Sequence, residues 1–168
     1  MDFLELAKKR YSVRKFLDKD VEQEKIDYML ECAKVAPTAA NRQPVYIKFI
    51  DGHTQLEKIK EVTKYTFNAP VWMLIVYDKQ LSWKNKYTGE DKGDIDAAIV
   101  ITHMMLAATQ QGLGTCWVGS FDLKRAREIF ELDDRYQAVA LLPIGYPDET
   151  VDPNPLHYQR DDSKEHIL

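Results

Sequence analysis

The sequence predicts an α+β fold in which helices flank a sheet, and three observations lead to this prediction. Segments with apolar residues spaced three and four apart, as in helices, alternate with short apolar runs of strand length. One such run, Val71–Asp78, is almost continuously apolar, which is typical of a central strand covered on both faces. The composition, with 45% hydrophobic and 30% charged residues over 168 positions, supplies the core of one compact domain, residues 1–168.

The amino-terminal part of the chain is predicted to hold two helices. Asp2 is placed to cap a helix that runs to about Lys9, because its carboxylate can accept amide protons of the first turn. Asp20 is expected to cap a second helix over Glu22–Val35, and Pro37 ends that helix.

Strands and helices continue to alternate along the rest of the chain. Alternating residues predict a strand over Val45–Ile50, and Thr54 with Glu57 forms a capping-box pattern that starts a third helix. The polar excursion Lys79–Gly93 is interpreted as a lid, and Asp94–Gln111 as the central buried helix.

The last third completes the predicted core and adds a tail. It contains a short strand through Thr115–Val118, a helix capped by Asp122 and a strand over Gln137–Ile144. Residues 146–168 are polar and punctuated by prolines, so we interpret them as an extended arm that wraps around a partner subunit.

Composition and charge exclude several classes of protein. The net charge of −4 gives no long-range attraction for nucleic acid or for anionic lipid. The longest apolar stretches, residues 71–77 and 97–106, fall short of the roughly 20 residues that cross a bilayer. No secretory signal pattern opens the chain, and Cys32 and Cys116 form no CxxC unit. We therefore expect a cytoplasmic protein with two buried free thiols and with neither nucleic acid nor membrane as a partner.

The first candidate site is the segment RYSVRKF at residues 10–16. In an extended chain, residues two apart point the same way, so Arg10, Ser12 and Arg14 can converge. Two guanidinium groups and a hydroxyl match the oxygens of a terminal phosphate. A solvated basic segment after a helix is the alternative interpretation.

Two further segments carry candidate ligand-binding residues. The loop PTAANRQP at residues 37–44 combines small side chains with Asn41 and Gln43, which suits the edge of a flat heteroaromatic ring, although it could be a simple connection. The segment GLGTCWVG at residues 112–119 follows a helix and leads into a strand, so it is not a dinucleotide-binding loop. Gly119 could let a ring approach the backbone, whereas Gly112 could be a plain helix stop.

In this order and at these separations, the three segments resemble the nitroreductase family of flavoproteins, and the resemblance covers nearly the whole chain. It implies a three-layer sandwich with a mixed, mainly antiparallel sheet and a carboxy-terminal arm exchanged between subunits. It also implies a homodimer that binds FMN at the subunit interface and uses NADH or NADPH as the electron donor.

The resemblance assigns cofactor-binding roles to residues of this sequence. In the phosphate and ribityl site these are Arg10, Tyr11, Ser12, Arg14 and Arg160. In the loop that the second subunit lays against the flavin these are Pro37, Thr38, Ala39, Asn41 and Gln43. At the ring these are Asn68, Trp117, Val118 and Gly119.

The chemistry that this resemblance implies is ping-pong hydride transfer from NAD(P)H to nitroaromatic, quinone-like or related acceptors. Flavin N5 would carry it, so no catalytic side chain is assigned, and the scattered histidines form no triad. Asp94 and Asp96 could suggest a metal pair, but they fit better as charges at a helix start, so no metal is expected.

Three alternatives stay open. A reductive dehalogenase or another specialised flavin enzyme would need charged groups over the flavin, which Lys84, Lys86 and Glu90 of the lid could supply. A module that stores or senses FMN would bind it without turnover. An interaction domain without a cofactor would use Arg10 and Arg14 as surface charge.

Overall fold

A four-stranded antiparallel sheet forms the centre of the computed structural model, which describes residues 1–50, 52–162 and 166. The strand order is β1-β2-β4-β3. The strands are β1 (Val45–Ile50), β2 (Val71–Asp78), β3 (Gly114–Thr115) and β4 (Tyr136–Gly145). A parallel bridge between Ser12 and Thr115 adds the amino-terminal segment beside β3. The four named strands pair antiparallel throughout, and the parallel contact is confined to this bridge, so the expectation of a mainly antiparallel sheet is confirmed.

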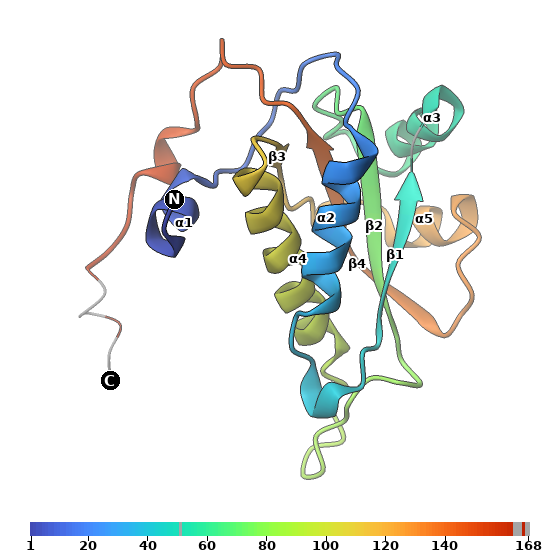
Figure 1. The fold of residues 1–168 in the computed structure, drawn as a ribbon. Helices are drawn as coiled ribbons and strands as arrows, with labels where there is room; N and C mark the ends of the chain where they lie inside the picture. Colours follow the sequence, from blue (N-terminus) through green and yellow to red (C-terminus); the bar gives the residue numbers. More distant parts are fainter. Residues whose placement is uncertain (51, 163–165, 167–168) are drawn as a thin grey trace.

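Helices cover both faces of this sheet and make the three-layer sandwich expected from the sequence. The helices are α1 (Phe3–Lys9), α2 (Gln23–Lys34), α3 (Gly52–Val62), α4 (Gly93–Gln110) and α5 (Leu123–Ile129). Two short 3-10 turns, η1 (Ala39–Asn41) and η2 (Pro155–His157), complete the described elements. Helices α2 and α4 pack on one face, and α3 and α5 lie on the other (Figure 1).

Strand β2 separates two apolar cores, because side chains alternate across a strand. Its residues are all buried; Met73 and Ile75 pack with α2 and α4, whereas Trp72 and Leu74 pack with α3 and α5. The prediction of a central strand covered on both faces is confirmed.

Helix α4 is the central buried helix that the sequence predicts. Ala97, Ile101, Met104 and Ala108 are buried within the core that α4 shares with α2 and the sheet. Gly112 lies just beyond its end with φ +76°, a conformation that glycine adopts without steric cost. None of the helices that the structure describes combines the length and the apolar character needed to cross a membrane.

The predicted helix caps at Asp2 and Asp122 are confirmed, whereas the one at Asp20 is wrong. The Asp2 carboxylate accepts the N–H of Glu5, and Asp122 accepts the N–H of Arg125. Asp20 does not cap α2, because the helix begins at Gln23 and its preceding residue, Glu22, makes no side-chain cap. A carboxylate three residues before the first helical residue lies too far along the chain to act as the cap.

Two further boundaries differ from the predictions. Helix α3 begins at Gly52 rather than at a Thr54 cap. Strand β3 contains only Gly114 and Thr115, because after two residues the chain leaves the ladder and pairs again only at Val118, opposite Leu141.

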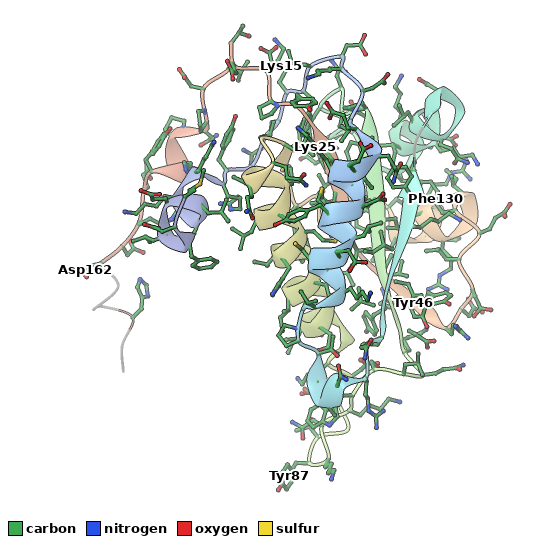
Figure 2. The ribbon with its side chains drawn as sticks, viewed as in Figure 1. Lys15, Lys25, Tyr46, Tyr87, Phe130 and Asp162 are labelled. Atoms are coloured by element: carbon green, nitrogen blue, oxygen red, sulfur yellow. The ribbon has the colours of Figure 1, made fainter. Side chains whose placement is uncertain are left out.

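The excursion at residues 79–93 is a narrow hairpin. Lys84 pairs with Asp91, and the Asn85 N–H donates to the carbonyl of Glu90 at 2.9 Å. Tyr87 lies at its tip (Figure 2). The hairpin is thus an ordered projection.

The tail passes alongside α1 (Figure 1). The ring Nε2 of His157 in η2 lies 3.1 Å from the carbonyl oxygen of Lys8. Of the predicted arm, residues 163–165 and 167–168 lie outside the described residues, and its exchange between subunits stays a prediction.

Candidate functional site: an arginine-lined cavity and a strained loop

The segment 10–16 lies extended along β3. It leaves α1 at Arg10, and the Val13 N–H donates to the Thr115 carbonyl at 2.9 Å. Gly114 permits this approach, because a Cβ there would lie 2.5 Å from Cγ2 of Val13. Val13 is buried, so the neighbouring positions Ser12 and Arg14 face away from the core.

The predicted phosphate-binding residues meet in one cavity of about 220 Å³. Its walls come from the amino-terminal segment and from the tail, and they comprise Arg10, Tyr11, Ser12, Arg14, Asn154, Leu156, His157 and Arg160. The structure therefore brings Arg160 to the three residues that the sequence grouped at positions 10–14.

The three guanidinium groups of this cavity carry positive charge that no carboxylate neutralises among the described residues. Arg14 Nη1 donates to the Ser12 carbonyl at 3.3 Å, and Arg160 Nη1 donates to the Leu156 carbonyl at 3.1 Å. Each guanidinium has five N–H donors, so most remain available to a ligand. The arrangement suits a phosphate group.

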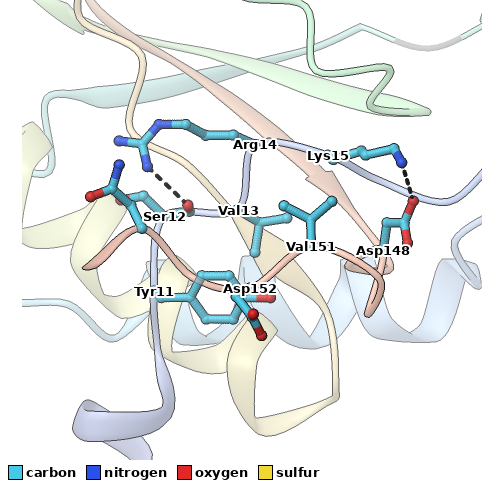
Figure 3. A pocket seen from close by; sticks show the side chains of 9 residues that line it. Tyr11, Ser12, Val13, Arg14, Lys15, Asp148, Val151 and Asp152 are labelled. Atoms are coloured by element: carbon cyan, nitrogen blue, oxygen red, sulfur yellow. Dashed lines mark hydrogen bonds and ion pairs between the residues drawn. The ribbon is translucent and has the colours of Figure 1, made fainter. Parts of the chain in front are cut away.

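An adjoining cavity of about 170 Å³ shares the wall formed by Tyr11, Ser12 and Arg14. Figure 3 shows Lys15 reaching Asp148 across this region, with Nζ and Oδ2 2.8 Å apart. Because Asp148 opens the tail, this ion pair ties the tail to the phosphate segment.

Two weak acids beside the cavity stay protonated at neutral pH. Burial raises the pKa of the Cys116 thiol, although Arg14, a hydrogen bond with Ser12 and Arg10 act to lower it. Burial also raises the pKa of Tyr11, and the Glu149 carboxylate adds to that increase. The Tyr11 hydroxyl is therefore a hydrogen-bond donor, and Cys116 is not poised as a nucleophile.

The predicted ring-binding residues border the phosphate segment. The Phe16 N–H donates to the Phe67 carbonyl at 3.2 Å, so Asn68 lies next to this segment. Trp117 and Gly119 continue from β3 beyond Thr115, and both are exposed, whereas Val118 is buried.

The loop at residues 37–44 forms a compact turn after α2. The hydroxyl of Thr38 accepts the N–H of Gln43 at 3.0 Å, and the Gln43 side chain donates to Oδ1 of Asn41 at 3.3 Å. Asn41 and Gln43 are exposed. The loop therefore presents its polar side chains outward and is ordered by its own hydrogen bonds.

Backbone strain marks the predicted cofactor segments. Among the described residues, six that are not glycine have a positive φ: Ala40, Asn41, Gln43, Phe67, Asn68 and Glu131. Five of the six lie in the 37–44 loop or in the Phe67–Asn68 turn. Such conformations cost of order 1 kcal/mol or more each and cluster at binding sites, where the surrounding structure holds them.

One chain does not bring all the predicted residues together. The 37–44 loop lies near the start of α4, and the phosphate segment lies near its end (Figure 1). From Asp96 to Gly112 a helix rises about 24 Å. The cavity around Arg10 accordingly contains no residue of the loop, and a groove near the loop contains Thr38 and Gln43 but no arginine.

Sequence reasoning missed several residues that build these two regions. Arg42 Nη1 lies 3.4 Å from the carbonyl oxygens of Leu81 and Ser82, and so joins the loop to the hairpin. Asn154 and His157 line the arginine cavity. Asn154 and His157 could have been found in the sequence only through their closeness to Arg160. A proline-rich tail has no periodic pattern that predicts its path.

Comparisons with known proteins agree with this architecture. The model of the nitroreductase family matches residues 7–66 and 63–146. A protein of Methanothermobacter thermautotrophicus, whose name proposes an NADH dehydrogenase/NAD(P)H nitroreductase, is 30% identical over 173 residues, covering 95% of this chain and 88% of the relative.

Two solved structures extend the comparison. A nitroreductase family protein from Clostridium difficile 630 is 36% identical with a TM-score of 0.93, covering 100% of this chain and 98% of that one. A proposed nitroreductase from Exiguobacterium sibiricum, solved in complex with FMN, shares the fold at 20% identity with a TM-score of 0.86, covering 100% and 97%. The chain therefore belongs to the nitroreductase family.

Proposed function

We propose that this protein is a homodimeric FMN-dependent oxidoreductase that uses NADH or NADPH to reduce nitroaromatic, quinone-like or related acceptors. The observation that carries the proposal is the cavity in which Arg10, Arg14 and Arg160 have no acidic partner among the residues described. Membership of the family, and the FMN complex of the Exiguobacterium relative with the same fold, support FMN as the ligand. The names of two relatives, which mention NAD(P)H and NADPH, support a nicotinamide donor.

The residues present fit the phosphate of FMN. Arg10, Arg14 and Arg160 would neutralise its charge, and the Ser12 hydroxyl would donate a further hydrogen bond. The raised pKa of Tyr11 keeps a phenolic donor at the same wall. Charge-assisted hydrogen bonds of this kind contribute about 1.5–3 kcal/mol each.

The residues around the flavin ring are assigned the role of orienting it. Asn68 and the exposed backbone at Trp117–Gly119 would face the ring, with Val118 holding that segment against β4. Pro37, Thr38, Ala39, Asn41 and Gln43 of the second subunit would close the other side and exclude water. The strained backbone at Asn68 and in the 37–44 loop supports this assignment.

Bound FMN would accept two electrons from the nicotinamide and pass them to the acceptor. The protein then needs no nucleophile or metal, and its side chains bind, orient and shield. Cys116, whose pKa is raised by burial, is not assigned a role in the reaction.

The first experiment is an absorption spectrum of the purified protein with added FMN, followed by anaerobic titration with NADH and with NADPH. A bound flavin that loses its oxidised absorption with either nicotinamide, and regains it with a quinone, is the expected result. Bound flavin that neither nicotinamide reduces would support the storage module instead. Failure to bind FMN would contradict both.

A second experiment tests the assignment of the two regions to different subunits. Arg14→Ala should weaken FMN binding about 10- to 100-fold, since it removes a charge-assisted contact. We expect Asn41→Ala to weaken it as well. In a mixed dimer of the two variants, one site receives both intact regions and the other receives neither.

The mixed dimer should therefore bind one FMN with wild-type affinity. Two weakened sites, each matching one of the single variants, would mean that both regions act within one subunit, which contradicts the proposal. Lys124→Ala, on the exposed side of α5, provides a control for loss of positive charge.

The dehalogenase alternative needs free charged groups on the hairpin. Glu90 is engaged within the hairpin, with Oε2 2.8 Å from Nζ of Lys92. This contact does not favour Glu90 as a group that binds a substrate zwitterion. Comparing a halogenated aromatic amino acid with a quinone as acceptor would separate the two functions.

A further inference from the structure

Asp96 is a buried carboxylate beside the loop that bears the predicted flavin contacts. It lies in the first turn of α4 and is only 2% exposed. Its Oδ1 accepts the backbone N–H of Ala39 at 2.8 Å. Its Oδ2 is buried without a hydrogen-bond partner among the described residues. Asp94, two residues earlier in the same turn, is exposed.

This arrangement is costly for stability alone. A buried carboxylate loses its hydration, and an oxygen without a partner costs about 1–3 kcal/mol. The amino-terminal end of α4 and the hydrogen bond from Ala39 act against this loss. An apolar residue at position 96 would avoid the cost of this buried oxygen. We therefore explain the carboxylate by its hydrogen bond to the Ala39 N–H rather than by a contribution to folding stability.

Ala39 is the residue at which the backbone enters its strained conformation. The next two residues, Ala40 and Asn41, have φ of 52° and 51°. Binding the Ala39 amide therefore fixes the loop directly before its left-handed residues.

Other hydrogen bonds also hold this loop, but none of those between described residues joins it to α4. Thr38 binds Gln43 within the loop, and Arg42 binds the carbonyl groups of Leu81 and the buried Ser82 in the hairpin. At the end of the loop, the Asp78 N–H of β2 donates to the Pro44 carbonyl at 2.8 Å. Among the hydrogen bonds of the described residues, the one from Ala39 to Asp96 connects the loop to the central helix.

We propose that Asp96 is a positioning residue of the flavin site: by holding the Ala39 amide, it keeps the 38–43 loop in the conformation that meets the FMN of the partner subunit. The inference rests on the proposed function and deepens it. Asp96 does not touch the reacting atoms and acts through Ala39, Ala40 and Asn41.

The test compares three variants of the full-length protein. Asp96→Ala removes the acceptor. Asp96→Asn keeps a side-chain carbonyl for the Ala39 N–H. It replaces Oδ2, the oxygen without a partner among the described residues, with an amide NH2 group. Asp94→Asn removes the same charge from the same turn but from an exposed side chain, and it is the matched control.

The first readout is hydrogen exchange of the backbone amides of residues 38–43, measured without FMN. Asp96→Ala should accelerate exchange in this loop at least about 10-fold, which corresponds to the loss of one hydrogen bond to a charged group. Asp96→Asn should restore most of the protection, and Asp94→Asn should match wild type. Unchanged exchange in Asp96→Ala overturns the inference.

The second readout is the FMN dissociation constant from flavin fluorescence. We expect Asp96→Ala to raise it about 10-fold, with Asn rescuing and the Asp94 control unaffected. A purely structural residue would change the melting temperature of the protein but not the affinity of the folded protein for FMN. Equal affinity in wild type and Asp96→Ala overturns the inference, whereas a wild type that binds no FMN overturns the proposed function itself.

Discussion

Lys15 and Asp148 are joined twice, once through their side chains and once through their backbones. The ammonium and carboxylate groups lie 2.8 Å apart, and the Asp148 N–H donates to the Lys15 carbonyl at 3.1 Å. Thr150 adds a hydroxyl and a backbone donor to the same carboxylate. The hydrogen bond from Lys15 and those from Thr150 lower the pKa of Asp148 from 3.8 to about 2.

This pKa predicts how stability depends on pH. A carboxyl whose pKa is lower in the folded state stabilises that state above its unfolded pKa, and this stabilisation is lost as the pH falls through the folded value. Asp148→Asn should therefore melt at a lower temperature than wild type at neutral pH. The difference should shrink between about pH 4 and pH 2 and vanish below that range.

Thermal denaturation of both proteins across this range provides the measurement. Asp152→Asn removes an exposed carboxylate from the same tail and is the control. A difference in melting temperature that persists unchanged at about pH 2 would show that Asp148 acts by some means other than its charge.

An added methyl group should lower the stability of the protein at Gly114 but leave it nearly unchanged at Gly119. At Gly114 the new Cβ would lie 2.5 Å from Val13, so Gly114→Ala should cost about 1–3 kcal/mol of unfolding free energy. At Gly119 the nearest atom is the Trp117 indole nitrogen at 3.4 Å, so Gly119→Ala should change stability by less than about 0.5 kcal/mol.

Gly119→Ala should lower FMN affinity even though it leaves stability nearly unchanged. If the ring approaches its backbone, the methyl group should lower FMN affinity about 10-fold, equal to about 1.4 kcal/mol. Urea denaturation and fluorescence titration measure the two quantities separately. A Gly119→Ala protein that binds FMN as wild type does would remove Gly119 from the site.

The two cysteines should differ in reactivity. Cys32 is half-buried, whereas Cys116 is buried and its pKa is raised by that burial. Since the thiolate is the reactive form, Cys116 should react with a disulfide reagent at about pH 8 at least roughly 10-fold more slowly than a free thiol. Cys32→Ser leaves Cys116 as the thiol being measured. Rapid modification of that variant in its folded state would contradict the burial and pKa described for Cys116.

Tyr87 should affect the binding of the acceptor rather than the binding of FMN. It is 99% exposed at the tip of a hairpin that Arg42 joins to the 37–44 loop. An exposed aromatic ring at this position can stack on a planar acceptor, and such contacts contribute about 0.5–1.5 kcal/mol. Tyr87→Ala should therefore raise the KM for a quinone about two- to tenfold without changing the FMN dissociation constant.

Steady-state kinetics with the neighbouring Lys86→Ala as control would test this role for Tyr87. Equal KM values for wild type and Tyr87→Ala would mean that the hairpin tip does not reach the acceptor. A parallel change in FMN affinity would instead place Tyr87 at the cofactor.

Much of the fold follows from local patterns in the sequence. The bounds predicted for β1 and β2 match the structure, and Asp122 caps α5 as expected, because alternation, continuous burial and capping are properties of neighbouring residues. The Asp20 prediction failed because α2 begins at Gln23, three residues later, and local patterns define where an element begins less sharply than which element forms.

The site was less accessible to sequence reasoning. Arg10, Ser12 and Arg14 are close in sequence, and their convergence with one another and with Arg160 in one cavity agrees with the prediction. Their assignment to FMN stays a prediction. Asp96 was interpreted as a charge near a helix start, and nothing in its neighbours indicates that Ala39, 57 residues away, donates to it.

Helix α4 fixes the angular register between the two ends of the molecule. Asp96 near its start holds the strained loop, and the chain beyond Gly112 at its end supports the arginine segment. Inserting one residue between them would rotate one end against the other by about 100°, while lengthening the helix by only about 1.5 Å. Natural variation in the length of α4 should therefore occur in steps close to whole helical turns, whereas the 79–93 hairpin, which lies outside this span, is free to grow or shrink by single residues.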